Sequence, residues 1–163
     1  MRIWINNRQR KTVLSQEKVR RKAGKVLNAL GWSEGELSLT LVNDRAMARL
    51  NRETFGRRGP TNVIAFPLDA ASFPHEPGAV QAGPPPVLGE VVISLETTRR
   101  QARESGWPWR ELLDFYLIHG ILHLLGYDHD DPEDAARMEA TAWELMRLLH
   151  PGRSWDLDAG AGE

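Results

Sequence analysis

The spacing of hydrophobic residues changes repeatedly along the chain, which predicts a mixture of strands and helices. Alternating or short continuous hydrophobic runs predict four strands, at residues 2–6, 37–42, 63–66 and 87–93. Hydrophobic residues at helical spacing predict five helices, at residues 15–30, 44–50, 94–106, 109–125 and 132–150. Helix-capping residues precede three of them, at Ser15, Asn43 and Ser94. We therefore expect an α/β fold with a mixed sheet of about four strands.

Two of these elements should be more buried than the rest. Strand 87–93 is apolar on both faces, which predicts an interior strand of the sheet. Helix 109–125 is apolar on most sides, which predicts a buried central helix with the other helices flanking it. Residues 51–59 are polar and basic and are expected to form a loop. A single domain over residues 1–150 follows, with a flexible tail at 151–163.

Prolines and glycines interrupt residues 70–86, where we expect an extended loop. His75 lies in this segment and is expected at the surface, far from the other histidines.

The composition is that of an ordinary globular protein, with 41% hydrophobic and 26% charged residues among 163. The chain has no cysteine, so disulfides, thiolate metal sites and cysteine nucleophiles are excluded. No hydrophobic run approaches the roughly 20 residues needed to span a bilayer, and the amino terminus has no apolar signal region. We therefore expect a cytoplasmic protein without membrane contact.

The net charge of −1 conceals an uneven distribution along the chain. Residues 1–110 carry 18 Lys and Arg against 10 Asp and Glu, whereas residues 111–163 carry 3 against 12. Either both halves present solvated surfaces, or the first half offers a basic surface to a polyanion. Nucleic-acid binding through total charge is excluded, so any such binding must be local. The basic residues Arg20, Arg21, Lys22 and Lys25 are expected on a solvated helix face.

Three of the five histidines fall within eleven residues, at His119, His123 and His129. The first two lie one helical turn apart, so both imidazoles can face one ion. Gly126 suits the end of that helix, and His129 can then return from a loop as a third ligand. Three protein ligands leave a position open for water, as in catalytic zinc sites. Neutral imidazoles also suit nickel, cobalt, copper and manganese, so the metal is not determined.

This spacing matches the metzincin peptidase pattern H-E-x-x-H-x-x-G-x-x-H with one difference. Gly120 replaces the glutamate that acts as general base in those peptidases. Because glycine cannot accept a proton, the peptidase mechanism is not available as it stands. A metal there can still activate water or polarise a phosphoryl oxygen.

Residues 119–129, H-G-I-L-H-L-L-G-Y-D-H, resemble the signature of the YbeY family of bacterial single-strand-specific endoribonucleases. Other segments agree in order, namely Leu-Asn-Arg at 50–52, Pro-Thr-Asn-Val-Ile-Ala-Phe-Pro at 60–67 and Leu-Gly-Glu-Val-Val-Ile-Ser at 88–94. The resemblance covers about residues 1–150. It implies a zincin-like fold, one zinc ion on the three histidines, and cleavage of single-stranded RNA. It also implies 16S ribosomal RNA 3′-end processing and ribosome quality control, with the small ribosomal subunit and assembly factors as partners.

The loop before the Pro-Thr-Asn segment departs from the family pattern. Many members have an arginine after an aromatic residue and an aspartate nearer the proline, where this chain has Phe55 and Arg58. The loop arginine is either supplied by Arg57 or Arg58 or lost. The candidates for RNA contact are Arg57, Arg58, Thr61 and Asn62.

The catalytic groups are unknown beyond the metal-bound water. Asp128 is a candidate to orient a metal-bound histidine through a hydrogen bond. Trp107 and Trp109 can stack on bases, although packing within the protein is the favoured role for both.

Two other functions remain open at this point. One is a zincin-like metallopeptidase or another metal-dependent hydrolase, which Gly120 disfavours. The other is a non-catalytic ribosome-assembly factor with a structural metal, which the lack of a fourth protein ligand disfavours.

Overall fold

The computed structural model describes residues 1–68 and 86–153. Within them the strands are β1 (Arg2–Asn7), β2 (Glu36–Val42), β3 (Val63–Pro67) and β4 (Val87–Ser94). The helices are α1 (Gln16–Ala29), α2 (Asp44–Phe55), α3 (Leu95–Ser105), α4 (Trp109–Leu124) and α5 (Pro132–Leu149). Most of the expected loop 70–86, His75 and most of the expected tail 151–163 lie outside these residues. The single domain over 1–150 stays a prediction.

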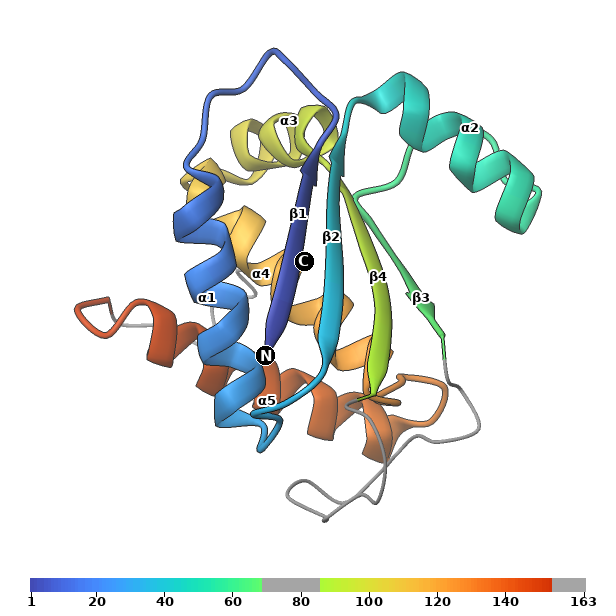
Figure 1. The fold of residues 1–163 in the computed structure, drawn as a ribbon. Coiled ribbons are helices and arrows are strands. Elements are labelled where there is room, and N and C mark those ends of the chain that lie inside the picture. The colour runs from blue at the N-terminus through green and yellow to red at the C-terminus, as the bar shows by residue number, and fades with distance from the viewer. Residues whose placement is uncertain (69–85, 154–163) are drawn as a thin grey trace.

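The four strands form one mixed sheet in the order β1-β2-β4-β3 (Figure 1). β1 pairs parallel with β2, β2 pairs parallel with β4, and β3 pairs antiparallel with β4. The α/β fold class and the interior position of strand 87–93 are therefore confirmed. β3 is an edge strand, so one side of its backbone is free to face a cleft.

Helix α4 lies against one face of the sheet, beside α1 and α5 (Figure 1). Ten of its 16 residues are buried, and eight of these join side chains of β1, β2 and β4 in the main core. A helix buried on nearly every side has no polar stripe, which is why its sequence is apolar almost throughout. The expected buried central helix is confirmed.

Helix α2 lies at one end of the sheet, where its start contacts α3 (Figure 1). Met47 packs with Val42, Ile64 and Val92 in a second, small hydrophobic cluster. The Asp44 carboxylate at its first turn accepts hydrogen bonds from Ser94 Oγ (2.7 Å), Thr97 Oγ1 (2.5 Å) and Arg100 Nη1 (2.7 Å). Polar contacts with α3 therefore fix the start of α2, while its far end projects past the sheet.

The expected caps are confirmed, because Ser15, Asn43 and Ser94 each accept a backbone N–H of their helix. The loop expected over 51–59 is wrong for its first half, since α2 continues to Phe55. Asn51 is buried on α2, and its Nδ2 donates to Gly59 O at 3.0 Å. A helix with one narrow buried side shows mostly polar residues, and this composition resembles that of a loop. The helix ends only where Gly56 takes a left-handed conformation, at φ 66°.

The buried carboxylate of Asp114 links α4 to α1 and to the end of α5. Asp114 of α4 is only 3% exposed. Lys22 Nζ of α1 lies 2.9 Å from Asp114 Oδ2, and His150 Nε2 after α5 lies 2.7 Å from the same oxygen. The solvated role expected for Lys22 is therefore wrong, whereas Arg21 and Lys25 are exposed as expected. Helical spacing places Lys22 at the boundary of the apolar stripe, where only the facing helix decides its partner.

Replacement of Asp114 by alanine should lower the free energy of unfolding by about 3 kcal/mol, because Lys22 and His150 then lose a buried partner. Urea unfolding followed by circular dichroism measures the change. As a control, Arg137→Ala removes an exposed pair with Asp134 (3.8 Å) and should change stability by less than about 0.5 kcal/mol. Equal losses in both variants would contradict the structural role of the buried carboxylate.

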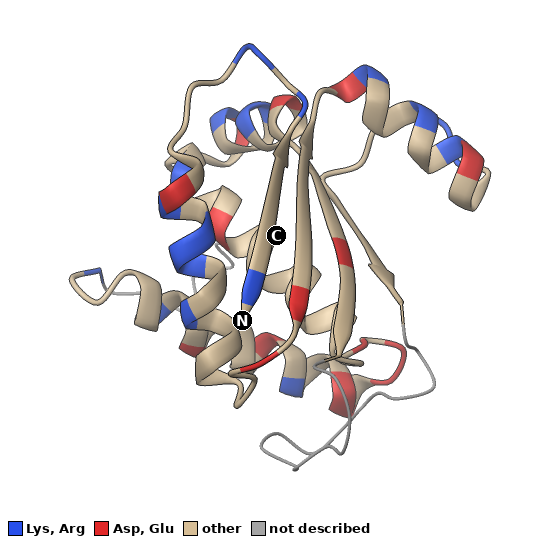
Figure 2. Cartoon of the chain, viewed as in Figure 1, with Lys and Arg blue, Asp and Glu red and all other residues tan. Residues whose placement is uncertain are grey.

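Charges of opposite sign gather at opposite ends of the molecule (Figure 2). Lys and Arg dominate α2, α3 and the loop before α1, whereas Asp and Glu gather around the start of α5. The uneven distribution along the chain thus becomes a separation in space. Among the described residues, no helix has both the length and the apolar character needed to cross a bilayer.

Candidate functional site

The candidate site begins on the last two turns of α4. His119 and His123 lie one turn apart there and are both half-buried, surrounded by the aliphatic residues that make the helix central. His119 stacks on the Phe115 ring, with the ring centroids 4.3 Å apart. The helix ends at Leu124, and Gly126 follows with φ 93°, a conformation that favours glycine. This turn redirects the chain toward His129.

His129 stands in the loop before α5 and is exposed. Its ring centroid lies 5.4 Å from that of His123, so the turn brings the second and third histidines together. Within the described ranges 1–68 and 86–153, no three His, Asp or Glu side chains form a ready-made metal cluster. The three-histidine metal site therefore stays a prediction.

The chemistry of these side chains suits a divalent metal. Burial, followed by the nearby His123 and His129, lowers the pKa of His119 to about 4. Burial, followed by the nearby His129, also lowers the pKa of His123. Both α4 imidazoles are therefore neutral at pH 7, which is the form that binds a metal. The donor set fits a zinc-type ion.

A cleft of about 780 Å³ opens beside His123 and His129. The end of α2 and the following loop form one wall, the edge strand β3 forms the floor, and the turn after α4 forms the other wall. Its lining comprises Asn51, Phe55, Arg57, Arg58, Pro60, Thr61, Val63, Ile64, Ala65, Pro67, His123, Gly126, Tyr127, Asp128 and His129. Segments separated by about 70 residues in the sequence thus meet at one cavity.

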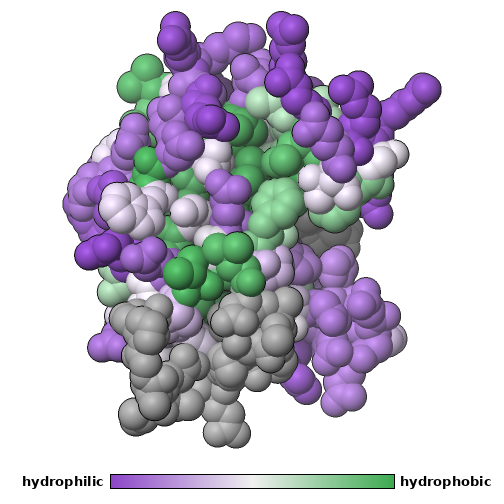
Figure 3. Space-filling view, turned by 45° about the vertical axis from the view of Figure 1, so that its right-hand side comes forward, coloured by the Kyte–Doolittle hydropathy of each residue, from purple (hydrophilic) through white to green (hydrophobic). Residues whose placement is uncertain are grey.

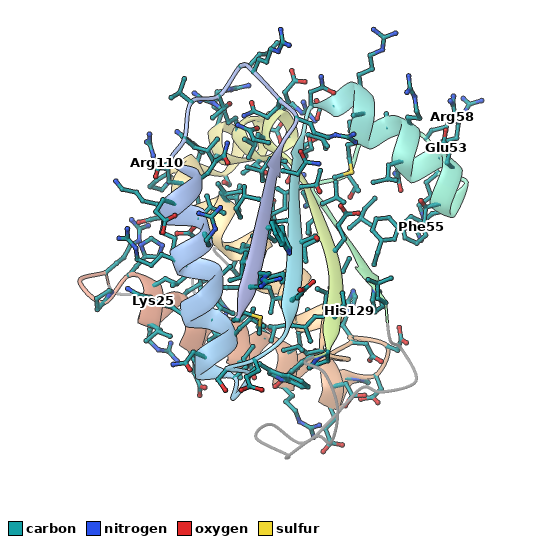
Figure 4. The ribbon with its side chains drawn as sticks, viewed as in Figure 1. Lys25, Glu53, Phe55, Arg58, Arg110 and His129 are labelled. Carbon is teal, nitrogen blue, oxygen red and sulfur yellow. The ribbon has the colours of Figure 1, made fainter. Side chains whose placement is uncertain are left out.

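The two walls carry different chemistry. Arg57 and Arg58 are exposed on the α2 side, whereas the histidines and Asp128 belong to the opposite side. Phe55 points from the end of α2 back toward the strands, on the side where His129 lies (Figure 4). The cleft therefore combines two guanidinium groups, an aromatic ring and imidazoles around an aliphatic floor.

The Pro-Thr-Asn segment contributes unequally to this cleft. Thr61 lines it, as an RNA-contacting residue should. The Asn62 amide is engaged within the protein: Oδ1 accepts from Val63 N at 2.7 Å, and Nδ2 donates to Gln101 Oε1 at 3.2 Å. Tyr116 OH also donates to Gln101 Oε1. The contacts of Asn62 therefore tie the start of β3 to α3 and α4.

The chain matches known proteins over nearly its whole length. A family model described as Endoribonuclease YbeY matches residues 4–150. The protein named Endoribonuclease YbeY from Syntrophus aciditrophicus is 39% identical over 152 residues, covering 92% of this chain and 91% of that protein. The chain belongs to the YbeY family.

A second relative agrees with this assignment, and one solved structure shares the fold. The protein of the same name from Geobacter sulfurreducens is 38% identical over 154 residues, covering 93% of this chain and 98% of that protein. The solution structure of TM1509 from Thermotoga maritima has a similar fold, with a TM-score of 0.60 and 24% identity. The similarity covers 97% of this chain and 98% of that chain.

Gly120, which replaces the peptidase glutamate in this YbeY-family chain, lies where α4 crosses the sheet. A Cβ atom there would stand 2.4 Å from Val91 Cγ1 and 3.2 Å from Val63 Cγ2. The glycine is therefore required by close packing of α4 on β3 and β4.

Asp128 lines the cleft, and its Oδ1 accepts a hydrogen bond from Asp130 N at 3.2 Å. Its charge raises the pKa of His123, although less than burial lowers it. Its proposed role in orienting a histidine stays a prediction.

The two tryptophans considered for base stacking lie elsewhere. Trp107 packs on Phe115 and Trp143, at centroid distances of 5.7 and 6.0 Å. Trp109 contacts the guanidinium groups of Arg99 and Arg110. Neither lines the cleft, and both pack against the core, which confirms the favoured expectation. Sequence reasoning overlooked Phe55 as an aromatic residue of the cleft, because only the position of α2 reveals it.

Proposed function

We propose that this protein is a metal-dependent endoribonuclease that cleaves single-stranded RNA in the cleft between α2 and α4. The observation that carries the proposal is the meeting of Arg57 and Arg58 with His123 and His129 around one cavity. Cationic side chains bind a phosphate backbone, and neutral imidazoles bind a metal. Membership of a family described as endoribonucleases supports the same activity.

We propose His119, His123 and His129 as the ligands of one divalent ion per chain, with zinc as the first candidate and other divalent metals as alternatives. When bound, such an ion supplies Lewis acidity to a phosphoryl oxygen and favours ionisation of water. The neutral state of both α4 imidazoles supports this assignment, because a protonated imidazole cannot coordinate.

The protein's own side chains then position the RNA. Arg57 and Arg58 bind backbone phosphates and stabilise the negative charge that develops during cleavage. Thr61 offers a hydroxyl to the backbone at the floor of the cleft. Asp128 adjoins His129 and has a carboxylate facing the same space, but the group that moves the proton stays unassigned. A single strand can fold its bases into such a cleft, whereas a duplex is stiffer and wider.

The resemblance of residues 119–129 to the family signature also supports a proposal for the role of the protein in the cell. We propose a cytoplasmic role in 16S ribosomal RNA 3′-end processing and ribosome quality control. The small ribosomal subunit and its assembly factors are the proposed partners.

A metallopeptidase is the second candidate, because the free edge of β3 lines the cleft. An extended peptide can pair with such an edge as an added strand. Against it stands Gly120, whose position leaves no room for the glutamate of a zincin peptidase.

Incubation of the metal-loaded protein with single-stranded RNA, duplex RNA and an unstructured peptide distinguishes these functions. We expect cleavage of the single strand alone, lost on treatment with a chelator and restored by zinc. A catalytically inactive His123→Ala sample, purified identically, controls for contaminating nucleases. Peptide hydrolysis with intact RNA would establish the second candidate, and no cleavage of either would favour an assembly factor without catalysis.

A further inference from the structure

The cleft contains an aromatic residue in an unusual setting for a hydrophobic side chain. Phe55 is 52% exposed, although it lines the cavity that holds His123 and His129. Isolated exposed hydrophobic residues are common on protein surfaces. Here, however, the ring stands between guanidinium groups and imidazoles, opposite the candidate reaction centre. A phenyl ring offers RNA an apolar face on which a base can stack, in addition to the charge supplied by the arginines.

The backbone around Phe55 is held firmly. Phe55 is the last residue of α2, and Gly56 N closes the helix by donating to Arg52 O at 2.9 Å. Asn51 Nδ2 holds the following loop through Gly59 O, at 3.0 Å. The ring is therefore presented from a fixed helix end, and a stacking partner does not need to order a loose segment first.

The Arg57 guanidinium carbon lies 5.9 Å from the centroid of the Phe55 ring. A guanidinium can cover only one face of a ring, and half of the residue's surface remains exposed. Aromatic faces beside arginine are the usual platform for single-stranded nucleic acid, since bases stack while the cation binds the adjacent phosphate. The aliphatic floor of Val63, Ile64 and Ala65 extends this apolar surface.

Hydrophobic residues gather in the middle of the molecular face seen in Figure 3, with hydrophilic side chains above and beside them. The cleft itself combines the exposed Phe55 ring with the Arg57 and Arg58 side chains, which suits a nucleotide, whose base is largely apolar on its faces and whose phosphate is charged. Duplex RNA keeps its bases stacked on one another and cannot offer a free face to the ring.

We propose that Phe55 and Arg57 form a nucleotide subsite, in which one unpaired base of the RNA stacks on the Phe55 ring and Arg57 binds its phosphate. The proposal rests on the proposed endoribonuclease function and specifies how the cleft selects single strands. Phe55 acts here as a specificity-determining residue.

Binding of fluorescently labelled single-stranded RNA to chelator-treated protein, followed by anisotropy, tests the subsite without cleavage. Phe55→Ala should weaken binding by about 5- to 150-fold. Phe55→Leu should weaken it similarly, because leucine keeps the apolar bulk but lacks an aromatic face. Phe55→Trp should preserve binding. Thermal melts of each variant should match the parent, since the ring is half exposed.

Trp4 provides a matched control on the opposite edge of the sheet. It is 54% exposed and also carries an arginine near its ring, with the Arg2 guanidinium carbon 5.8 Å from the centroid. Trp4→Ala should leave RNA affinity unchanged. Equal weakening by Trp4→Ala and Phe55→Ala would overturn the proposal.

Two further readouts separate stacking from a general loss of structure. An abasic nucleotide placed at the stacked position should weaken parental binding but add nothing to Phe55→Ala. Phe55→Ala should also leave the salt dependence unchanged, whereas Arg57→Ala should reduce the slope of log K against log salt by about 0.7. If Phe55→Ala still weakens binding to the same extent whichever nucleotide of the RNA is made abasic, the proposed subsite is wrong. If parental protein cleaves RNA in that case, the endoribonuclease function stands; if it neither binds nor cleaves RNA, that function fails as well.

Discussion

Replacement of His119 by alanine should remove the bound metal and lower RNA cleavage by more than about a hundredfold. Loss of a residue that merely orients a metal ligand already costs about 10- to 100-fold, so loss of a ligand itself should cost more. His119 is half-buried and stacks on Phe115, so its imidazole is held in place by the protein. Elemental analysis gives the metal content, and cleavage of a labelled single strand gives the rate.

The comparison variant for this experiment is His75→Ala, at a histidine that the sequence places far from the other three. It should retain one metal ion per chain and full activity. A His119→Ala protein that keeps its metal and cleaves RNA normally would contradict the ligand assignment. A protein that loses its metal while ribosomal RNA matures normally in cells would instead indicate a structural metal.

Replacement of Gly120 by alanine should lower the free energy of unfolding by about 1–3 kcal/mol, the usual cost of overpacking a core. The added Cβ would stand 2.4 Å from Val91 Cγ1. Val91 is fully buried in the interior strand β4, and its branched side chain has little rotamer freedom. The gain in helix propensity, up to about 1 kcal/mol, only partly offsets the clash. Urea unfolding measures the difference.

Gly24 of α1 is a matched control, because a Cβ there would meet only Ile3 Cδ1 at 3.7 Å, an ordinary contact. Gly24→Ala should therefore be neutral or stabilise by up to about 1 kcal/mol. Val91→Ala alone should destabilise by leaving a cavity, but combined with Gly120→Ala it should cost less than the sum of the two. Stabilisation by Gly120→Ala would show that α4 does not pack this closely on β4.

The close packing of Gly120 against β4 also helps to distinguish RNA cleavage from peptide cleavage. Gly120→Glu should destabilise the protein rather than restore a peptidase base, because the Cβ of the glutamate would already stand 2.4 Å from the buried Val91 Cγ1. A buried, unpaired carboxylate is also strongly unfavourable. The absence of the glutamate thus reflects how α4 is seated on the sheet as well as the chemistry of the site.

Much of the fold was predictable because its signals are local. The side chains of Ser15, Asn43 and Ser94 each accept one of the first backbone N–H groups of their helix, so these helix starts appear directly in the sequence. The even hydrophobicity of 87–93 reflects burial on both faces of an interior strand. These features depend on a residue and its near neighbours, and all were confirmed.

The wrong predictions concern polar residues whose environment depends on a partner that is not a near neighbour in the sequence. Asn51 looked like the start of a loop, but its amide is satisfied by Gly59 O on the far side of a helix end. Lys22 looked solvated, but α4 presents the buried Asp114 to it. A polar residue can be stable in water or beside a buried partner, and its own neighbours in sequence do not distinguish these environments.

The family resemblance and the one-turn spacing of His119 and His123 could be recognised before the fold was known, because short motifs and helical periodicity are local properties. The sequence also indicated Arg57 and Arg58 as loop cations near an RNA-binding segment. That these arginines and Phe55 face His123 and His129 across one cleft became visible only in the folded chain. That meeting depends on how α2 and α4 pack against the sheet, through contacts between residues far apart in the chain. The same contacts explain Gly120, whose missing side chain is a requirement of packing.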